Sequence, residues 1–218
     1  MHRRLLTLDR SVTALSAQKK NPNRINVFLD GEFAFGLSRI VAAWLRVGEI
    51  LSEEKIARLK EQDSLEVATQ RAIELISYRP RSEAEIRKRL TEKGFGAQEV
   101  EEVLGRLRQA GLVSDEAFAR TWADNRSTFR PRSHRMVAAE LRQKGVANET
   151  IEQALSELPD DGDLAYQTAL RYARRLEGED WEGFRKKLGG HLGRKGYSYE
   201  TVANATRRVW KELRDEAS

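Results

Sequence analysis

The chain repeats one short pattern three times at a constant spacing. Leu90, Leu141 and Leu192 lie 51 residues apart, and each is followed three positions later by a Lys-Gly pair. Repetition at a fixed period is typical of proteins built from stacked units, because a small unit buries too little apolar surface to be stable alone. The sequence therefore predicts an array of similar units instead of one large core.

Apolar residues and a linker extend this register in both directions. Downstream, the spacing i, i+3, i+4, i+7 of one buried helix face recurs in every unit. The residues are Val100, Val103, Leu104 and Leu107, then Ile151, Ala154, Leu155 and Leu158, then Val202, Ala205, Thr206 and Val209. Upstream, Tyr78-Arg79-Pro80-Arg81-Ser82 recurs as Phe129-Arg130-Pro131-Arg132-Ser133. We expect an N-terminal region over 1–66 and repeats over 67–117, 118–168 and 169–218.

Helix start and stop signals divide each unit into three helices. In the first unit Pro80 ends a helix, because the residue before a proline avoids the helical region. Ser82 caps the second helix and Glu85 completes a capping box. Lys93-Gly94 ends that helix with a cation in the last turn and a glycine suited to the left-handed position beyond it. We expect the outer two helices of this unit over 67–78 and 97–109.

The third unit departs from this pattern. It lacks the Arg-Pro-Arg-Ser linker, and we expect Lys187 in place of the apolar residue that Ile86 and Val137 contribute to the earlier units. A terminal unit of a repeat array is often atypical because it has a neighbour on one side only. The third unit is therefore either a terminal cap or a modified binding unit.

The N-terminal region has strand signals instead of helix signals. Residues 12–37 alternate or carry short apolar runs, and Asp30-Gly31 between two such runs predicts a hairpin, since both central positions of a type I′ turn need positive φ. Residues 38–47 and 52–62 read as helices, the second capped by Ser52. The predicted fold is mainly α, with three tandem three-helix repeats in an elongated curved array after a small antiparallel sheet.

Few residues suit catalysis or metal binding. The chain has no cysteine, so disulfides and thiolate chemistry are excluded. Residues 189–196, GGHLGRKG, lack the spacing of a phosphate-binding loop and are better read as a helix C-cap, with an anion site as the alternative. His2, His134 and His191 are isolated, and the repeat register puts His191 on an exposed helix face. We expect no enzyme activity, no cofactor and no metal.

Neither a membrane span nor a secretory signal is evident, so we expect a soluble, cytoplasmic protein that makes no membrane contact. Six aromatic residues at or near helical spacing predict core packing, with stacking on nucleic-acid bases as the alternative. They are Phe118, Trp122, Tyr172, Trp181, Phe184 and Trp210.

Positive charge gathers at the two ends of the chain. The formal net charge is +5, and the last unit carries 12 basic against 8 acidic residues. Equivalent positions on stacked units line one side of an array, so recurring basic residues indicate either a groove for an anionic partner or a solvated face. The candidate binding residues are Arg79, Arg81, Arg130, Arg132, Arg135, Arg185, Lys186, Lys187, Arg194 and Lys195.

Three segments together resemble the RecX family of bacterial recombination regulators. They are SEAEIRKRLTEKGF over 82–95, VEEVLGRLRQAGLVSDEAFAR over 100–120, and AAELRQKGV over 138–146. The resemblance covers roughly 66–213 in motif order, spacing and three-unit layout. Arg130-Pro131-Arg132 and the N-terminal hairpin depart from the family pattern, so no contacts are carried over to them.

The resemblance implies a cytoplasmic, non-enzymatic protein that binds the RecA recombinase filament on single-stranded DNA, and we expect this protein to be a monomer. Such a protein modulates ATP hydrolysis and strand exchange in recombination, DNA repair and the SOS response, and we expect the effect to be inhibition. Direct contact with single-stranded or double-stranded DNA is a further implied possibility. Three-helix units also resemble helix-turn-helix modules, so a duplex DNA-binding regulator is the alternative.

Overall fold

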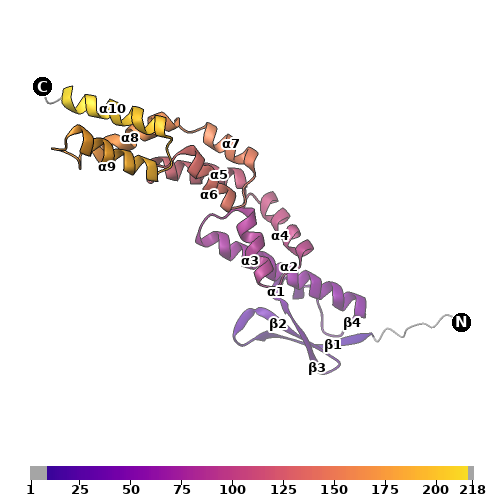
Figure 1. Ribbon diagram of the computed structural model, residues 1–218. Helices are drawn as coiled ribbons and strands as arrows, with labels where there is room; N and C mark the ends of the chain where they lie inside the picture. Colours follow the sequence, from indigo (N-terminus) through magenta and orange to yellow (C-terminus); the bar gives the residue numbers. More distant parts are fainter. Residues whose placement is uncertain (1–8, 216–218) are drawn as a thin grey trace. The chain divides into compact units, whose positions relative to one another are not determined.

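The computed structural model describes residues 9–215, which form two compact units. One unit comprises the chain up to Arg79 together with Ile86–Ala110, and the other comprises Pro80–Glu85 together with the chain from Gly111 onward. As predicted, the described chain is mainly helical after a small N-terminal sheet (Figure 1).

The sheet is antiparallel and four-stranded, in the order β3-β2-β1-β4. Its strands are β1 (Arg10–Gln18), β2 (Asn21–Leu29), β3 (Glu32–Ser38) and the two-residue β4 (Ile50–Leu51). Asp30 and Gly31 both have positive φ, at 52° and 89°, and join β2 to β3 as the hairpin prediction requires. Alternate side chains of β3, those of Phe35 and Leu37, enter the core of the sheet. The strand β4 was not predicted, because two residues carry too little pattern to be recognised.

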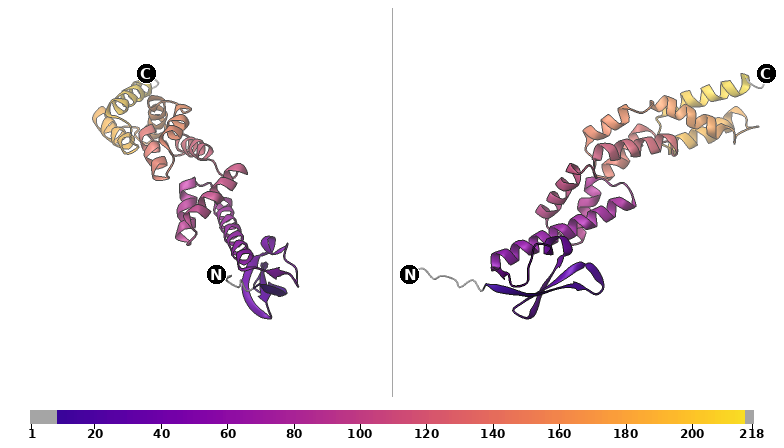
Figure 2. Two further views of the ribbon diagram at one scale, coloured as in Figure 1. Left: turned by 90° about the vertical axis from the view of Figure 1, so that its right-hand side faces the viewer. Right: turned by 180° about the vertical axis from the view of Figure 1, so that it is seen from behind.

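The two helices expected over 52–62 and 67–78 form one continuous helix, α2 (Glu53–Tyr78), shown from two sides in Figure 2. No glycine or proline lies within this stretch to interrupt it, so the expected limit at residue 66 falls inside the helix. Ser52 caps α2 as predicted, accepting a hydrogen bond from the Lys55 N–H at 3.2 Å. The helix expected over 38–47 is shorter, because α1 (Arg39–Ala42) has a single turn.

A buried carboxylate attaches α2 to the sheet. Asp63 of α2 accepts a hydrogen bond from the Ser38 N–H at 2.5 Å and pairs with the Arg24 guanidinium at 3.0 Å. The remaining helices of this region are α3 (Glu83–Glu92) and α4 (Ala97–Gln109). Leu90 is fully buried, and so are all four apolar residues assigned to the inner face of α4.

The second repeat contains α5 (Asp115–Thr128), α6 (His134–Gln143) and α7 (Asn148–Ser156). The third contains α8 (Asp161–Ala173), α9 (Trp181–Arg194) and α10 (Tyr199–Asp215), which pack side by side (Figures 1 and 2). Each of these two repeats has its own apolar cluster, one containing Leu141 and the other containing Leu192. The period of 51 residues therefore marks equivalent core positions.

The expected place of Lys187 in this register is wrong. Leu188 is the residue 51 positions after Val137, and Leu188 is completely buried whereas Lys187 is exposed. The apolar position of the middle helix is thus kept in the third repeat. The other departure, the missing Arg-Pro-Arg-Ser linker, is real: the N-cap of α9 is Asp180, which accepts a hydrogen bond from the Gly183 N–H at 2.8 Å.

Candidate functional site

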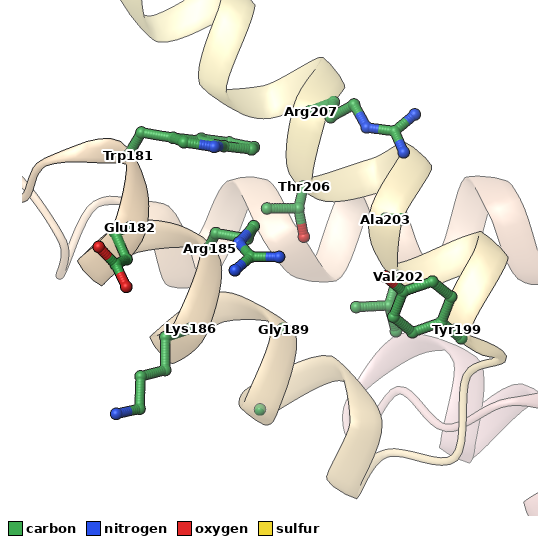
Figure 3. Close-up of a pocket in the computed structure, with 11 residues that line it drawn as sticks. Trp181, Glu182, Arg185, Lys186, Gly189, Tyr199, Val202, Ala203, Thr206 and Arg207 are labelled. Atoms are coloured by element: carbon green, nitrogen blue, oxygen red, sulfur yellow. The ribbon is translucent and has the colours of Figure 1, made fainter.

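A cationic groove lies between α9 and α10 of the third repeat (Figure 3). It has a volume of about 630 Å³ and is lined on the α9 side by Trp181, Arg185 and Lys186 and on the α10 side by Tyr199 and Arg207. Arg185 and Lys186, two of the predicted anion-binding residues, thus lie on a concave surface. Glu182 is the acidic residue among its lining residues.

Aromatic rings border this groove. The Tyr199 side chain is 85% exposed and that of Trp181 is 37% exposed, although large aromatic residues are usually buried. Trp181 also contacts Trp210, with ring centroids 5.5 Å apart, which fixes one face of its ring. Figure 3 shows Arg185 pointing into the space between the two helices while Lys186 points away from it. Positive charge between exposed rings suits an anionic partner that also offers flat surfaces.

Sequence reasoning did not find Arg207 and Tyr199. Both belong to α10, where the repeat pattern drew attention to the inner-face residues Ala205 and Val209 instead. The sequence did offer one signal: Arg207 and Tyr199 fall outside the i, i+3, i+4, i+7 set of buried positions, which places them on the exposed side of α10. Thr206, by contrast, is 2% exposed, and its hydroxyl has no hydrogen-bond partner among the described residues.

The remaining basic candidates of the third repeat do not line this groove. Lys187 pairs with Glu179, and Arg194 lies near His191, whose ring stacks on Tyr172 of α8. Lys195 follows the end of α9 and donates a hydrogen bond to the Pro131 carbonyl at 3.3 Å. The basic residues expected to form one stretch therefore divide between two flanks of α9 and the turn that follows it.

Each Arg-Pro-Arg-Ser linker contacts the Lys-Gly turn of the following repeat, and we call these two contacts the first and the second joint. In the first joint, Ser82 Oγ donates to the Lys144 carbonyl at 2.5 Å and Lys144 Nζ pairs with Glu85 at 2.8 Å. Gly145 approaches Ala84 so closely that an added Cβ would lie 2.3 Å from the Ala84 Cβ. All of these residues belong to the second compact unit.

The second joint repeats this arrangement 51 residues later. The Ser133 N–H donates to the Lys195 carbonyl at 3.0 Å, and Arg135 donates to the Gly196 carbonyl at 3.4 Å. Burial lowers the pKa of the Lys195 ammonium group, and nearby Arg132 and Arg171 lower it further.

The other arginine candidates have different surroundings. Arg79 and Arg81 are half-buried in the first linker, and both take part in interactions there. Arg130 is exposed. Arg132 pairs with Glu140 at 3.1 Å. These contacts show that part of the recurring basic pattern supports the packing of the repeats.

Glu140 lies at the centre of a polar cluster on α5 and α6. Its carboxylate accepts hydrogen bonds from Trp122 Nε1 at 2.8 Å and Arg126 Nε at 2.6 Å, in addition to the pair with Arg132. The Arg126 guanidinium also stacks over the Trp122 ring, 4.5 Å from its centroid. Trp122 therefore packs against the core as predicted, but it is only half-buried and its indole N–H makes a polar contact.

His191 is not exposed, contrary to the expectation from the repeat register. Its ring stacks on Tyr172 with centroids 3.9 Å apart, and the residue is half-buried. Burial lowers the pKa of His191, and Lys195, Arg194 and Arg175 lower it further. A neutral imidazole is thus favoured among several cations. His134 contacts the Pro159 carbonyl through Nε2 at 3.0 Å, while His2 lies outside the described residues.

Within residues 9–215 no group of three or more histidine or acidic side chains is arranged to hold a metal ion. Over the same residues, the helices lack the combination of length and apolar character that crossing a membrane requires. The stretch over 189–196 forms the end of α9, its C-cap Lys195 and Gly196 at φ 89°, which confirms the C-cap interpretation of these residues.

Comparison with known protein families identifies these repeats. Three family models match this chain: the RecX N-terminal domain over residues 10–52, the first RecX three-helix domain over 68–107, and the second over 114–155. The regulatory protein RecX of Bacillus pumilus is 30% identical over 209 residues, which cover 94% of this chain and 80% of that protein. The chain belongs to the RecX family.

Further RecX relatives agree with this assignment. The regulatory protein RecX of Listeria monocytogenes serotype 4b is 30% identical over 206 residues, covering 93% of this chain and 77% of the relative. A crystal structure of regulatory protein RecX superposes with a TM-score of 0.70 at 28% identity, over 91% of this chain and 99% of that one. RecX from Lactobacillus salivarius shares the fold, with a TM-score of 0.60 at 18% identity, over 68% and 97% of the two chains. The relatives are named as regulatory proteins, not as enzymes.

Proposed function

We propose that this RecX-family protein binds the RecA filament on single-stranded DNA and inhibits its ATP hydrolysis and strand exchange. Membership of the RecX family supports the choice of RecA as partner. The observation that carries the proposal further is the α9–α10 groove, where Arg185, Lys186 and Arg207 lie beside two exposed aromatic rings. We assign this groove to the contact with the anionic surface of the filament.

The alternative, a regulator that reads duplex DNA on its own, has less support. Such a reader places the last helix of each unit in the major groove, with cations near the phosphates. In two of the three repeats, however, this helix exposes carboxylates: α7 contains no lysine or arginine and exposes Glu149 and Glu152, and α4 exposes Glu101 and Glu102 near its start, whereas α10 of the third repeat exposes Arg207. Carboxylates at these positions repel a polyanion.

DNA-dependent ATP hydrolysis by the cognate RecA, titrated with this protein, tests the proposal. We expect the rate to fall at amounts of this protein well below equimolar, since one bound molecule affects neighbouring protomers of a filament. A rate that is unchanged at equimolar protein would contradict RecA inhibition. A shift of a short duplex in the absence of RecA would favour the alternative.

A triple variant tests the groove itself. Reversing Arg185, Lys186 and Arg207 to Glu should leave helical content unchanged, because exposed substitutions alter unfolding free energy by about 0.5 kcal/mol or less, while affinity for the filament should fall sharply. The matched control reverses Lys20, Lys88 and Lys93, which are exposed and lie outside the groove. Equal affinities of the two variants at low salt would show that the groove does not bind the filament.

Salt dependence distinguishes two chemical forms of the partner. If the groove binds DNA phosphates, the slope of log affinity against log salt should shrink by about 0.7 to 0.9 for each contact removed. If the groove binds acidic side chains of RecA, this relation per phosphate does not apply. Lys195 is left out of this variant because it is half-buried in the second joint.

A further inference from the structure

The two joints of the second compact unit hold equivalent lysines with different neighbours. Lys144 of the first joint pairs with Glu85 at 2.8 Å. Lys195 occupies the same place 51 residues later, but the position of Glu85 is taken by Met136. Among the described residues Lys195 is in no ion pair, and its ammonium group donates to the Pro131 carbonyl instead. The second joint thus keeps the cation and lacks the anion.

Additional cations surround Lys195. Arg171 donates to the Thr128 carbonyl at 3.5 Å, and Arg135 donates to the Gly196 carbonyl at 3.4 Å. Neither arginine pairs with a carboxylate in the part of the chain that the structure describes. Arg132 is the exception in this cluster, because it pairs with Glu140. Arg171 thus acts electrostatically on Lys195, Arg135 contacts the carbonyl of the residue that follows Lys195, and each of the three side chains donates to a neutral carbonyl group.

Such an arrangement is electrostatically unfavourable without an anion. The pKa of Lys195 is lowered first by its partial burial and then by the like charges of Arg132 and Arg171, whereas Arg171 and Arg135 are themselves exposed. A bound phosphate group offers several acceptor oxygens and a formal negative charge, and both lysine and arginine bind phosphate through charge-assisted hydrogen bonds.

We propose that the second joint is a binding site for one phosphate group, held by Lys195, Arg171 and Arg135. The phosphate belongs either to a free anion or to the backbone of a nucleic acid. This site is separate from the α9–α10 groove, which uses Arg185, Lys186 and Arg207. The proposal does not depend on RecA, so it can be tested with the full chain alone.

The variant Met136→Glu gives the sharpest test. It recreates at Lys195 the ion pair that Glu85 makes with Lys144, so it should keep the fold while occupying the cation that phosphate would use. The probe is inorganic phosphate titrated at constant ionic strength into protein with ¹³C-labelled lysine side chains. In the wild type, the Lys195 resonance should shift to saturation and its pKa should rise. In Met136→Glu, affinity should fall by about tenfold or more.

Lys195→Met and Lys144→Met form a matched pair, compared by calorimetry with phosphate. The first should lose binding, while the second should retain it because Lys144 lies in the joint that supplies its own carboxylate. If Lys195→Met does not fold, Met136→Glu still decides the question. Binding of phosphate by Met136→Glu with wild-type affinity would overturn the proposal.

A single-stranded oligonucleotide distinguishes the two sources of phosphate. Weakening of both inorganic phosphate and oligonucleotide binding by Met136→Glu indicates a site open to free anions. If the wild type binds no inorganic phosphate, and Met136→Glu weakens its oligonucleotide binding, the site is one for the nucleic-acid backbone. Both results support the proposal. If neither probe perturbs Lys195, or if an acidic peptide does so where phosphate does not, the proposal is wrong.

Discussion

The second and third repeats share their buried leucines but treat their cations differently. In the second repeat, Glu140 accepts hydrogen bonds from Arg126 and Trp122 and pairs with Arg132, so a carboxylate offsets part of the local positive charge. The equivalent position of the third repeat is His191, which stacks on Tyr172 among Lys195, Arg194 and Arg175. The core positions thus keep the period of 51 residues, whereas the charged positions do not. The buried positions are periodic, and the charged positions differ between the repeats.

The largest effect should come from the core positions that the repeats share. Leu141 and Leu192 are both completely buried. Replacing either by Ala removes buried methyl groups and leaves a cavity, so we expect a loss of about 2 to 5 kcal/mol of unfolding free energy. Denaturant melts measure this loss. Leu112→Ala is the control, since Leu112 is 51% exposed. A loss below about 0.5 kcal/mol at Leu141 would show that the two repeats do not share this core position.

Replacing the glycine of a Lys-Gly turn by alanine should cost more unfolding free energy where the turn forms a joint. Gly145 has φ 78°, and a Cβ added there would lie 2.3 Å from Ala84, whereas Gly94 has φ 90° and meets nothing within 4 Å. Gly94→Ala therefore carries only the strain of a left-handed residue, about 1 to 2 kcal/mol. Gly145→Ala adds a steric clash of about 1 to 3 kcal/mol. Equal losses in thermal melts would mean that the first joint is looser than the close approach suggests.

The polar cluster of the second repeat should be sensitive to a substitution that preserves its shape. Glu140→Gln keeps the volume of the side chain but removes the charge that strengthens its hydrogen bonds to Arg126 and Trp122, so we expect a loss of about 1 to 3 kcal/mol. Glu157→Gln is the matched control, because the Arg120–Glu157 pair is about half exposed on both sides and should contribute about 0 to 1 kcal/mol. Similar losses for both variants would show that the Glu140 cluster contributes no more than an exposed ion pair.

The sequence predicted those parts of the fold that local residues determine. The Asp30-Gly31 turn and the Lys-Gly helix ends were recognisable because their chemistry requires positive φ. The joints were not predicted, because they link residues about 60 positions apart, as in the pair between Lys144 and Glu85. The Lys-Gly motif was correctly read as a helix end, but its second role in packing depends on which segment lies against it.

The candidate site was predicted in part. Arg185 and Lys186 line the groove, but their partner Arg207 comes from α10 and carried no repeating signal. Lys195 was grouped with them because of its position in the sequence, although α9 turns its basic residues toward different neighbours. A helix spreads adjacent residues around its axis at 3.6 residues per turn, so a run of basic letters does not define one surface.

The smallest effect concerns the charge of His191, the counterpart of Glu140. Because the pKa of His191 is lowered from 6.5, first by burial and then by Lys195, Arg194 and Arg175, the folded protein binds a proton there less readily than the unfolded chain does. Its contribution to the unfolding free energy is therefore intact above about pH 6.5 and declines as the pH falls through that value. His191→Phe keeps a ring against Tyr172 and removes the titrating group.

We therefore expect His191→Phe to lose less unfolding free energy than the wild type between about pH 7.5 and pH 5.5, as measured by denaturant melts at both values. His134→Phe is the control, since it removes an imidazole that contacts Pro159 instead of a cluster of cations. If His134→Phe changed the pH dependence and His191→Phe did not, the cations around His191 would be screened by solvent. In that case the third repeat would tolerate its positive charge without an anion, and the contrast with the second repeat would rest on the two joints alone.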